Sequence, residues 1–293
     1  MSSFLSYLIG GLSLGSIYAL IALGYTMVYG IAKMLNFAHG DVIMIGGYIA
    51  WLIFSALDMP VWLAILCAIL VCTALGVTIE KIAYKPLRTA TPLAVLITAI
   101  GVSYLLQNSA LLIFGPAAKT FDSVVPDGTD LALGAVNITG ETIVTIIATV
   151  VIMVALTLFV NFTKSGKAML AVSEDKGAAQ LMGINVNKTI SMTFAIGSAL
   201  AAVAGILLCS TYPQIGPYTG AMPGIKAFTA AVFGGIGSIP GAMIGGVVLG
   251  VVENLSKAYI SSQLSDAIVF AILIIVLLVK PTGLLGKKIN EKV

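Results

Sequence analysis

The chain has 293 residues, of which 59% are hydrophobic and only 9% are charged. Soluble proteins are about half apolar and about a quarter charged, so this composition excludes an ordinary water-soluble domain and indicates an integral membrane protein. The net charge of +3 is too small and too dispersed to indicate a nucleic-acid-binding protein.

Stretches without a charged side chain recur along the whole chain. A helix needs roughly 20 mainly apolar residues to cross the hydrocarbon core of a bilayer. The first stretch is too long for a signal peptide and lacks its cleavage pattern, so we interpret it as mature structure. The sequence therefore predicts an all-α, polytopic transmembrane bundle that forms a single domain over residues 1–293. Its roughly eight hydrophobic segments are 1–32, 42–57, 59–79, 89–118, 142–163, 189–225, 227–252 and 267–279.

The first stretch is followed by a polar break, NFAHGD at residues 36–41, which contains the only histidine of the chain. Asn36 is a candidate cap for the following helix, because asparagine is favoured at helix N-termini. Asn36, His39, Gly40 and Asp41 are candidates for lining a translocation pathway. For His39 we favour the alternative of a hydrogen-bonded structural group.

Basic residues gather in three regions, and loops rich in lysine and arginine stay on the cytoplasmic side of a membrane. We expect a cytoplasmic loop at about 163–188 and a cytoplasmic tail at about 280–293. The connection at about 115–140 holds one lysine and three aspartates, with proline and glycine turn signals, and is predicted to be external. The basic residues in question are Lys81, Lys85, Arg88, Lys164, Lys167, Lys176, Lys188, Lys280, Lys287, Lys288 and Lys292.

Three full crossings after the 163–188 loop would put the basic tail outside, so one segment must be broken. The stretch GGIGSIPGAMIGG within 225–252 is the candidate, since glycine and proline interrupt a helix. We predict a half-helix entering from outside, a turn near residues 238–240 and a returning helix. Gly235, Gly237 and Lys226 are candidate pathway residues, and snorkelling of Lys226 to the surface is an equal alternative.

The two polar breaks share a plan, in which an apolar helix, a glycine-containing break and a helix rich in small residues follow one another. Interrupted segments in corresponding halves are typical of transporters with an internal repeat, and the sequence predicts such a repeat. Glycines at G-x-x-x-G spacing permit close helix packing. Such glycines can serve packing alone or can also have a role in function, and the sequence leaves both alternatives open. These pairs are Gly11/Gly15, Gly241/Gly245 and Gly246/Gly250.

The predicted cytoplasmic loop contains a short amphipathic helix at 173–183. Ser173 is its expected N-cap, with Glu174 and Asp175 in the first turn, where acidic groups are favoured. Gly183 is its expected end. An apolar stripe of Ala178, Leu181 and Met182 suits a groove on another cytoplasmic protein better than an anionic bilayer surface.

Four motifs in chain order resemble those of a known family. The pattern E-D-x-x-A-A-x-x-x-G, formed by Glu174, Asp175, Ala178, Ala179 and Gly183, is similar to the coupling loop with which permeases of ABC importers dock onto ATPases. It has Glu-Asp where Glu-Ala is usual. The other three resemble the LivH-type permease of branched-chain amino-acid ABC importers; they are LNFAHGD...GGY at 35–48, AVFGGIGSIPGA at 231–242 and KPTGLLG at 280–286.

This resemblance implies a multi-pass permease subunit in a bacterial inner membrane. It would pair with a LivM-type permease and two cytoplasmic ATPases, and an external binding protein would deliver leucine, isoleucine or valine. The residues themselves agree that ATP is bound elsewhere, because Lys188-Thr189 lacks the glycines of a phosphate-binding loop. We expect no enzymatic activity, no cofactor and no metal site in the chain itself.

Two alternatives remain open from the residues. An ion-coupled carrier would use buried carboxylates, and the acids near membrane segments are Asp41, Glu80, Glu253 and Asp266. A passive channel for small solutes is the other alternative. A carrier has no need for the predicted docking helix, and transport at an undiminished rate without ATPases would indicate a channel.

Overall fold

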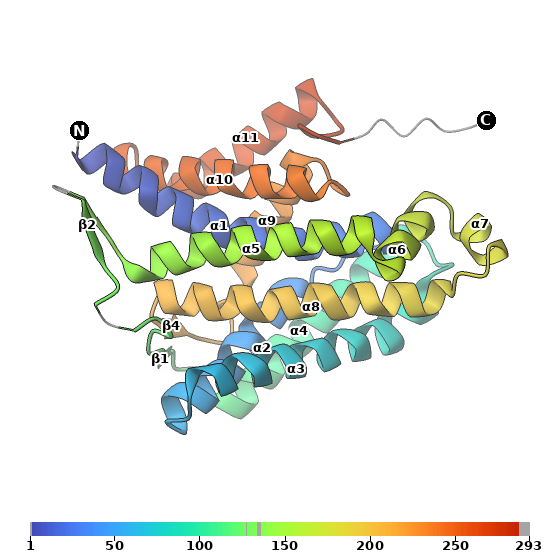
Figure 1. The fold of residues 1–293 in the computed structure, drawn as a ribbon, viewed down its shortest axis with the longest axis horizontal. Coiled ribbons are helices and arrows are strands. Elements are labelled where there is room, and N and C mark those ends of the chain that lie inside the picture. The colour runs from blue at the N-terminus through green and yellow to red at the C-terminus, as the bar shows by residue number, and fades with distance from the viewer. Residues whose placement is uncertain (1, 127, 134–135, 287–293) are drawn as a thin grey trace.

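The computed structural model describes residues 2–126, 128–133 and 136–286. Most of this part of the chain is helical, and short two-stranded ribbons join some of the helices (Figure 1). The α-helices are α1 (Ser2–Ala32), α2 (His39–Trp51), α3 (Val61–Ile79), α4 (Pro92–Phe114), α5 (Gly140–Phe162), α6 (Lys164–Glu174), α7 (Lys176–Leu181), α8 (Val186–Thr211), α9 (Ala221–Gly234), α10 (Ile239–Tyr259) and α11 (Ser265–Val279). The strands are β1 (Lys119–Thr120), β2 (Leu131–Leu133), β3 (Val136–Ile138) and β4 (Gln214–Ile215).

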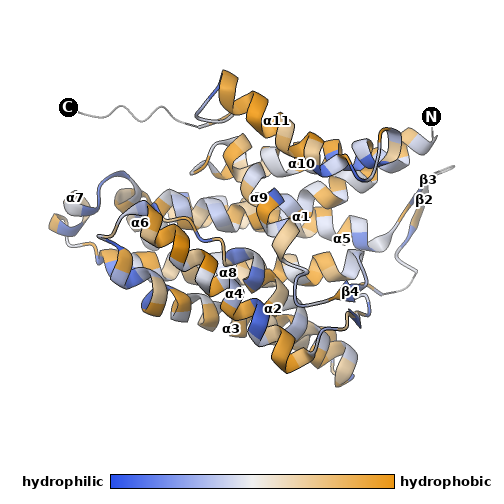
Figure 2. Cartoon of the chain, turned by 180° about the vertical axis from the view of Figure 1, so that it is seen from behind, coloured by the Kyte–Doolittle hydropathy of each residue, from blue (hydrophilic) through white to orange (hydrophobic). Residues whose placement is uncertain are grey.

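Among the described residues, seven helical segments are long and apolar enough to cross a membrane, and α11 is a shorter apolar helix. Together they correspond to the eight predicted hydrophobic segments, so the predicted polytopic bundle is confirmed. The most hydrophobic part of α8 is 72% buried within the chain, whereas that of α4 is only 17% buried. The core therefore lies around α8 and α1, while outer helices such as α11 consist mainly of hydrophobic residues (Figure 2), several of which are exposed.

The two ends of the bundle differ in composition and structure. One end, which we call the ribbon end, holds the N-terminus of α1 and the β-strands (Figure 1). There β1 pairs with β4 and β2 pairs with β3, both antiparallel. The opposite end, which we call the lysine-rich end, holds α6, α7 and the turn after α3. Two of the predicted basic regions, at 81–88 and 164–188, therefore lie together, and Lys287, Lys288 and Lys292 lie outside the described residues.

Helices α1 and α10 pack closely against each other through glycine. A Cβ atom on Gly15 would lie 2.7 Å from Val247 Cα, and one on Gly250 would overlap the backbone of Gly15. Gly245 packs in the same way on the backbone of Ala230 in α9. The G-x-x-x-G pairs thus hold three helices at backbone contact, as small residues do in membranes.

The second predicted break lies between α9 and α10, at residues 235–238. Helix α9 has 14 residues and so spans about 21 Å, which is too short for a full crossing. It runs towards the lysine-rich end and α10 returns to the ribbon end, where Tyr259 contacts Tyr7 with ring centroids 5.7 Å apart. The break begins three residues before the turn predicted near 238–240 and overlaps it at Ser238, because Ser238 caps α10 and Pro240 fits its first turn.

The motif at 280–286 packs against the end of α9 at this break. The backbone amides of Leu284 and Leu285 each donate a hydrogen bond of 2.9 Å, to the carbonyl oxygens of Phe233 and Gly234 respectively. These carbonyls end α9 and have no partner within it. The chain after α11 therefore seals the exposed end of the half-helix, while the predicted internal repeat stays a prediction.

Candidate functional site

The loop between α5 and α8 folds as two short helices, so the prediction of one helix capped by Ser173 is wrong. Ser173 lies in the last turn of α6, where its hydroxyl donates to the Leu170 carbonyl at 2.7 Å. Buried Met169 and Val172 hold α6 against the bundle and extend it to Glu174. Asp175 is the true cap of α7, and its carboxylate accepts a hydrogen bond of 2.9 Å from the Ala178 amide.

The end of α7 and its exposed apolar residues match the prediction from the sequence. Gly183 has a φ of +80°, a conformation that favours glycine, and it ends the helical region as predicted. Leu181 is 90% exposed and Met182 is 82% exposed, next to exposed Ala178. Ala179 is only 3% exposed and faces the chain itself. Of the predicted alanine pair, only Ala178 is therefore available to a partner.

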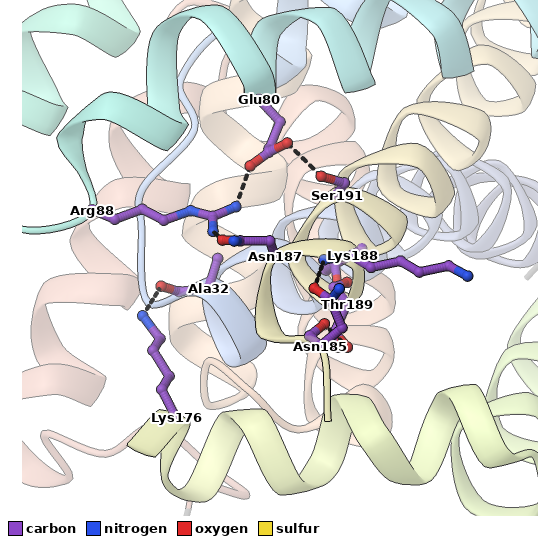
Figure 3. A network of polar contacts seen from close by, with 10 residues as sticks. Ala32, Glu80, Arg88, Lys176, Asn185, Asn187, Lys188, Thr189 and Ser191 are labelled. Atoms are coloured by element: carbon purple, nitrogen blue, oxygen red, sulfur yellow. Dashed lines mark hydrogen bonds and ion pairs between the residues drawn. The ribbon is translucent and has the colours of Figure 1, made fainter. Parts of the chain in front are cut away.

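At the lysine-rich end one hydrogen bond ties α7 to the end of α1, and a separate set of polar contacts lies close to it (Figure 3). Lys176 Nζ donates a hydrogen bond of 2.9 Å to the carbonyl oxygen of Ala32, the last residue of α1. A lysine at this place suits the negative end of the helix dipole. Burial lowers the pKa of Lys176, and the nearby charges of Arg88 and Lys33 lower it further. The lysine is thus held against the end of α1 despite neighbours of its own sign.

The separate set of polar contacts joins the segment after α3 to α8 through a carboxylate. Glu80, which is fully buried, accepts hydrogen bonds from Arg88 and from the Ser191 hydroxyl, the latter at 2.6 Å. Arg88 also donates to the Asn187 side chain, and Figure 3 shows Glu80 between Arg88 and Ser191. From the sequence, Glu80 could be assigned only to the end of a segment. Its partners Arg88 and Ser191 are eight and 111 positions away, and these separations follow no helical spacing that would predict the contacts.

The NFAHGD break places its polar residues in different surroundings. Asn36 accepts a hydrogen bond of 2.9 Å from the Tyr84 hydroxyl, so the prediction that it caps α2 is wrong. His39 is buried, packs edge-to-face on Tyr25 with centroids 4.7 Å apart, and lies against Gly24. These are packing contacts, so the hydrogen-bonded structural role that the sequence favoured for His39 stays a prediction.

Asp41 and Gly40 line a cavity of about 400 Å³ between α1, α2, α4 and α9. Gln107 Nε2 donates a hydrogen bond of 2.9 Å to Asp41 Oδ1 and lies 3.3 Å from Ser103 Oγ. Gly40 permits this arrangement, because a Cβ atom there would lie 2.7 Å from the Gly220 carbonyl oxygen of the α9 region. The rest of the wall is mainly aromatic and aliphatic.

Lys226 lies in a second cavity of about 240 Å³, nearer the ribbon end. Its Nζ atom is 2.8 Å from Glu253 Oε1 and 2.6 Å from Asp266 Oδ1. Glu253 also accepts hydrogen bonds from Lys257 at 2.6 Å and from the Tyr18 hydroxyl at 2.8 Å. Lys226 is therefore ion-paired inside the bundle and does not snorkel to the surface.

The predicted pathway residues thus fall into separate places. Gly235 and Gly237 lie at the break between α9 and α10, with φ values of +104° and +95°. A Cβ atom on Gly235 would overlap Gly286 in the tail. Both glycines belong to the lysine-rich end and line neither of the two cavities just described. Sequence reasoning missed Glu253, Asp266 and Tyr18 as partners, although Glu253 and Lys257 have the i, i+4 spacing of a helical ion pair.

Comparison with known proteins places the chain in a family. Residues 7–277 match the family described as "Branched-chain amino acid transport system / permease component". The chain is 48% identical to the high-affinity branched-chain amino acid transport system permease protein LivH of Salmonella typhimurium and to LivH of Escherichia coli K12. It is 46% identical to the corresponding protein BraD of Pseudomonas aeruginosa. Each alignment covers 99% of this chain and 98% of the relative. The chain therefore belongs to the family of permease components of branched-chain amino acid transport systems.

Proposed function

We propose that the chain forms part of the translocation pathway of an ATP-driven importer that moves leucine, isoleucine or valine. It pairs with a LivM-type permease, two cytoplasmic ATPases bind and hydrolyse ATP, and an external binding protein delivers the cargo. The names of the relatives support the cargo class. Membership of a permease family and seven candidate spans support a multi-pass protein of the bacterial inner membrane.

Orientation follows from charge. The lysine-rich end is cytoplasmic because basic loops are retained inside. The ribbon end, with residues 115–140 and the N-terminus of α1, is then external and faces the binding protein. Helix α9 enters from outside, and residues 280–286 lie at the cytoplasmic end.

The observation that carries the proposal is the exposed apolar tip of α7 at the lysine-rich end. Leu181 and Met182 are almost fully exposed on a short, well-capped helix outside the spans. Large apolar side chains exposed in water mark a site for a protein partner. The coupling residues are Glu174, Asp175, Ala178 and Gly183, with Ala179 holding α7 against the chain.

The test replaces Leu181 by arginine and measures co-purification of the ATPase subunits. We expect loss of co-purification, because arginine would place a charge in the apolar groove of the partner. Leu264→Arg is the matched control, since Leu264 is 54% exposed at the ribbon end and should leave ATPase binding intact. Normal ATPase binding by Leu181→Arg would contradict the proposed docking site.

The cluster of Lys226, Glu253 and Asp266 contains carboxylates within the bundle, and an ion-coupled carrier would use such groups. Each of these carboxylates is paired with a lysine in the described chain, whereas an exchangeable ion site needs a free ligand. The ion pairs tie α9 to α10 and α11. They therefore favour a structural role in the permease.

A further inference from the structure

The acidic groups inside the bundle differ in their counter-charges. Glu80 is paired with Arg88, and Glu253 is paired with Lys226 and Lys257. Asp41 is as deeply buried, yet its contacts in the described residues include no cation within ion-pairing distance. A charge buried without a partner strongly destabilises the folded protein. A lone carboxylate inside a membrane segment therefore indicates a functional site whose cation comes from elsewhere.

Two local features favour the negative charge without neutralising it. Asp41 lies in the first turn of α2, where the helix dipole stabilises an anion. The Gln107 amide donates to one of its oxygens at 2.9 Å. Gln107 is buried on α4 and fixes the carboxylate from across the cavity. The carboxylate is thus held in place for a cation at the cavity wall.

The remainder of the cavity suits a branched aliphatic group. Its volume of about 400 Å³ is within the range of small-molecule sites, which are mostly apolar with a few placed polar groups. Phe37, Leu96, Ile100 and Ile225 supply apolar wall, and Ser103 supplies a neutral hydroxyl beside Gln107. The part of the wall that the described residues form contains an anion but no lysine or arginine, so it can distinguish an ammonium group from a carboxylate.

The cavity opens on the flank of the bundle formed by α4 and α9. Ile100, Tyr104 and Ile225 at its rim are all exposed. Under the proposed function, the second permease subunit closes this flank. The cavity wall comes from α1, α2, α4 and α9, so relative movement of these helices would change its shape.

We infer that this cavity is a cargo site in which Asp41 binds the α-ammonium group of an aliphatic amino acid, while the apolar wall receives its side chain. This assignment rests on the proposed function. It also predicts that an alkylammonium without a carboxylate binds, whereas the matching carboxylate without an ammonium does not.

The direct test uses the Ser103→Cys variant of the permease in the assembled transporter. Ser103→Cys is nearly isosteric, and Cys67→Ser removes the native cysteine of this chain that is not buried. We expect 3-methylbutylamine to slow the reaction of the introduced thiol with a small maleimide at least fivefold. We expect 4-methylpentanoate, which has the same branched end but an anionic head, to leave the rate unchanged.

Two variants complete this test. Asp41→Asn keeps the shape and can still accept from Gln107, so it should fold but lose protection by the amine. Asp41→Glu keeps the charge and should retain protection. Equal protection by amine and carboxylate, or protection that survives Asp41→Asn, would overturn the assignment. The comparison of the two ligands needs no Asp41 variant and decides the matter even if that variant fails to assemble.

Uptake separates this assignment from the proposed function. In proteoliposomes with all subunits, ATP and binding protein, Asp41→Asn should lower leucine uptake at least tenfold without loss of ATPase binding. Asp58→Asn is the matched control, because Asp58 is exposed in a turn with a φ of +50° that asparagine also tolerates. If the unaltered complex takes up no leucine, the proposed function fails. If Asp41→Asn takes it up normally, only the assignment of Asp41 fails.

Discussion

The buried carboxylates of this permease fall into those that are paired with a basic residue and those that have no basic partner among the described residues. Glu80 and Glu253 belong to the first kind, since each is held by a basic residue and a hydroxyl group. Asp41 belongs to the second kind. His39 is also buried, but it is packed among apolar and aromatic groups and its Nε2 atom has no hydrogen-bond partner among the described residues.

Replacing His39 by glutamine should retain at least partial leucine uptake. The imidazole lies against Tyr25 and Gly24 behind the cavity, and the variant loses an aromatic contact worth about 1 kcal/mol. We expect a lower unfolding temperature in detergent together with measurable uptake in proteoliposomes. Complete loss of uptake with normal expression and assembly would instead show a specific role for the imidazole.

Replacing Lys226 by methionine should destabilise the protein strongly. The variant breaks the pair between Lys226 and Glu253, whose side chains are only 7% and 1% exposed, and breaking a buried ion pair costs about 3–5 kcal/mol. The Asp266 side chain is 41% exposed, so losing its lysine partner adds little. Thermal unfolding in detergent measures the effect. Lys257→Met is the matched control, because the Lys257 side chain is 38% exposed and such ion pairs contribute at most about 1 kcal/mol. Equal effects of the two variants would contradict the buried network.

Individual residues show where sequence reasoning stops. The identity of Asp41 as a cavity residue could be expected from its place beside glycine in a polar break. The pairing of Lys226 with Glu253 and of Tyr18 with Glu253 could not, because the partners are 27 and 235 positions apart. Such contacts follow from helix packing, which a single sequence does not encode locally.

At the scale of elements, the hydrophobic segments predicted the spans well because each must match the thickness of the bilayer. Their ends were less predictable. Ser173 looked like a cap, but the apolar contacts of Met169 and Val172 continue α6 past it. Likewise Pro240 looked like the turn, but proline is well tolerated in the first turn of a helix. The turn itself uses the left-handed conformations of Gly235 and Gly237.

Replacing Gly237 and Gly241 together by leucine should abolish uptake. Leucine at 237 would be strained by the positive φ, and a side chain at 241 would overlap the carbonyl of Gly234. The matched control is Gly101→Leu on α4, where an added Cβ atom meets nothing within 4 Å. Unchanged uptake by the double variant would refute the close packing of α9 and α10 at the break.

At the scale of the whole molecule, the lysine-rich end connects the proposed docking helix to the cavity. Lys176 begins α7 and binds the last carbonyl of α1. The chain then passes from α1 through the NFAHGD break to Asp41 at the start of α2. Movement of α7 can therefore reach the cavity through a short and continuous set of contacts.

Replacing Lys176 by methionine should weaken this connection without removing the docking surface. We expect normal co-purification of the ATPases, with leucine uptake lowered severalfold for each ATP hydrolysed, as measured in proteoliposomes. Lys167→Met on α6 is the matched control, because Lys167 is exposed and should leave this ratio unchanged. An unchanged ratio in Lys176→Met would exclude Lys176 as part of the coupling route.

The central claim is that this chain moves its cargo only when partner subunits hydrolyse ATP. It is tested most directly by leucine uptake into proteoliposomes that contain the permease pair with and without the ATPases, in the presence of the binding protein. We predict uptake against a gradient only when the ATPases and internal ATP are both present. Uptake at an undiminished rate without the ATPases would contradict the claim and identify a channel or an ion-coupled carrier.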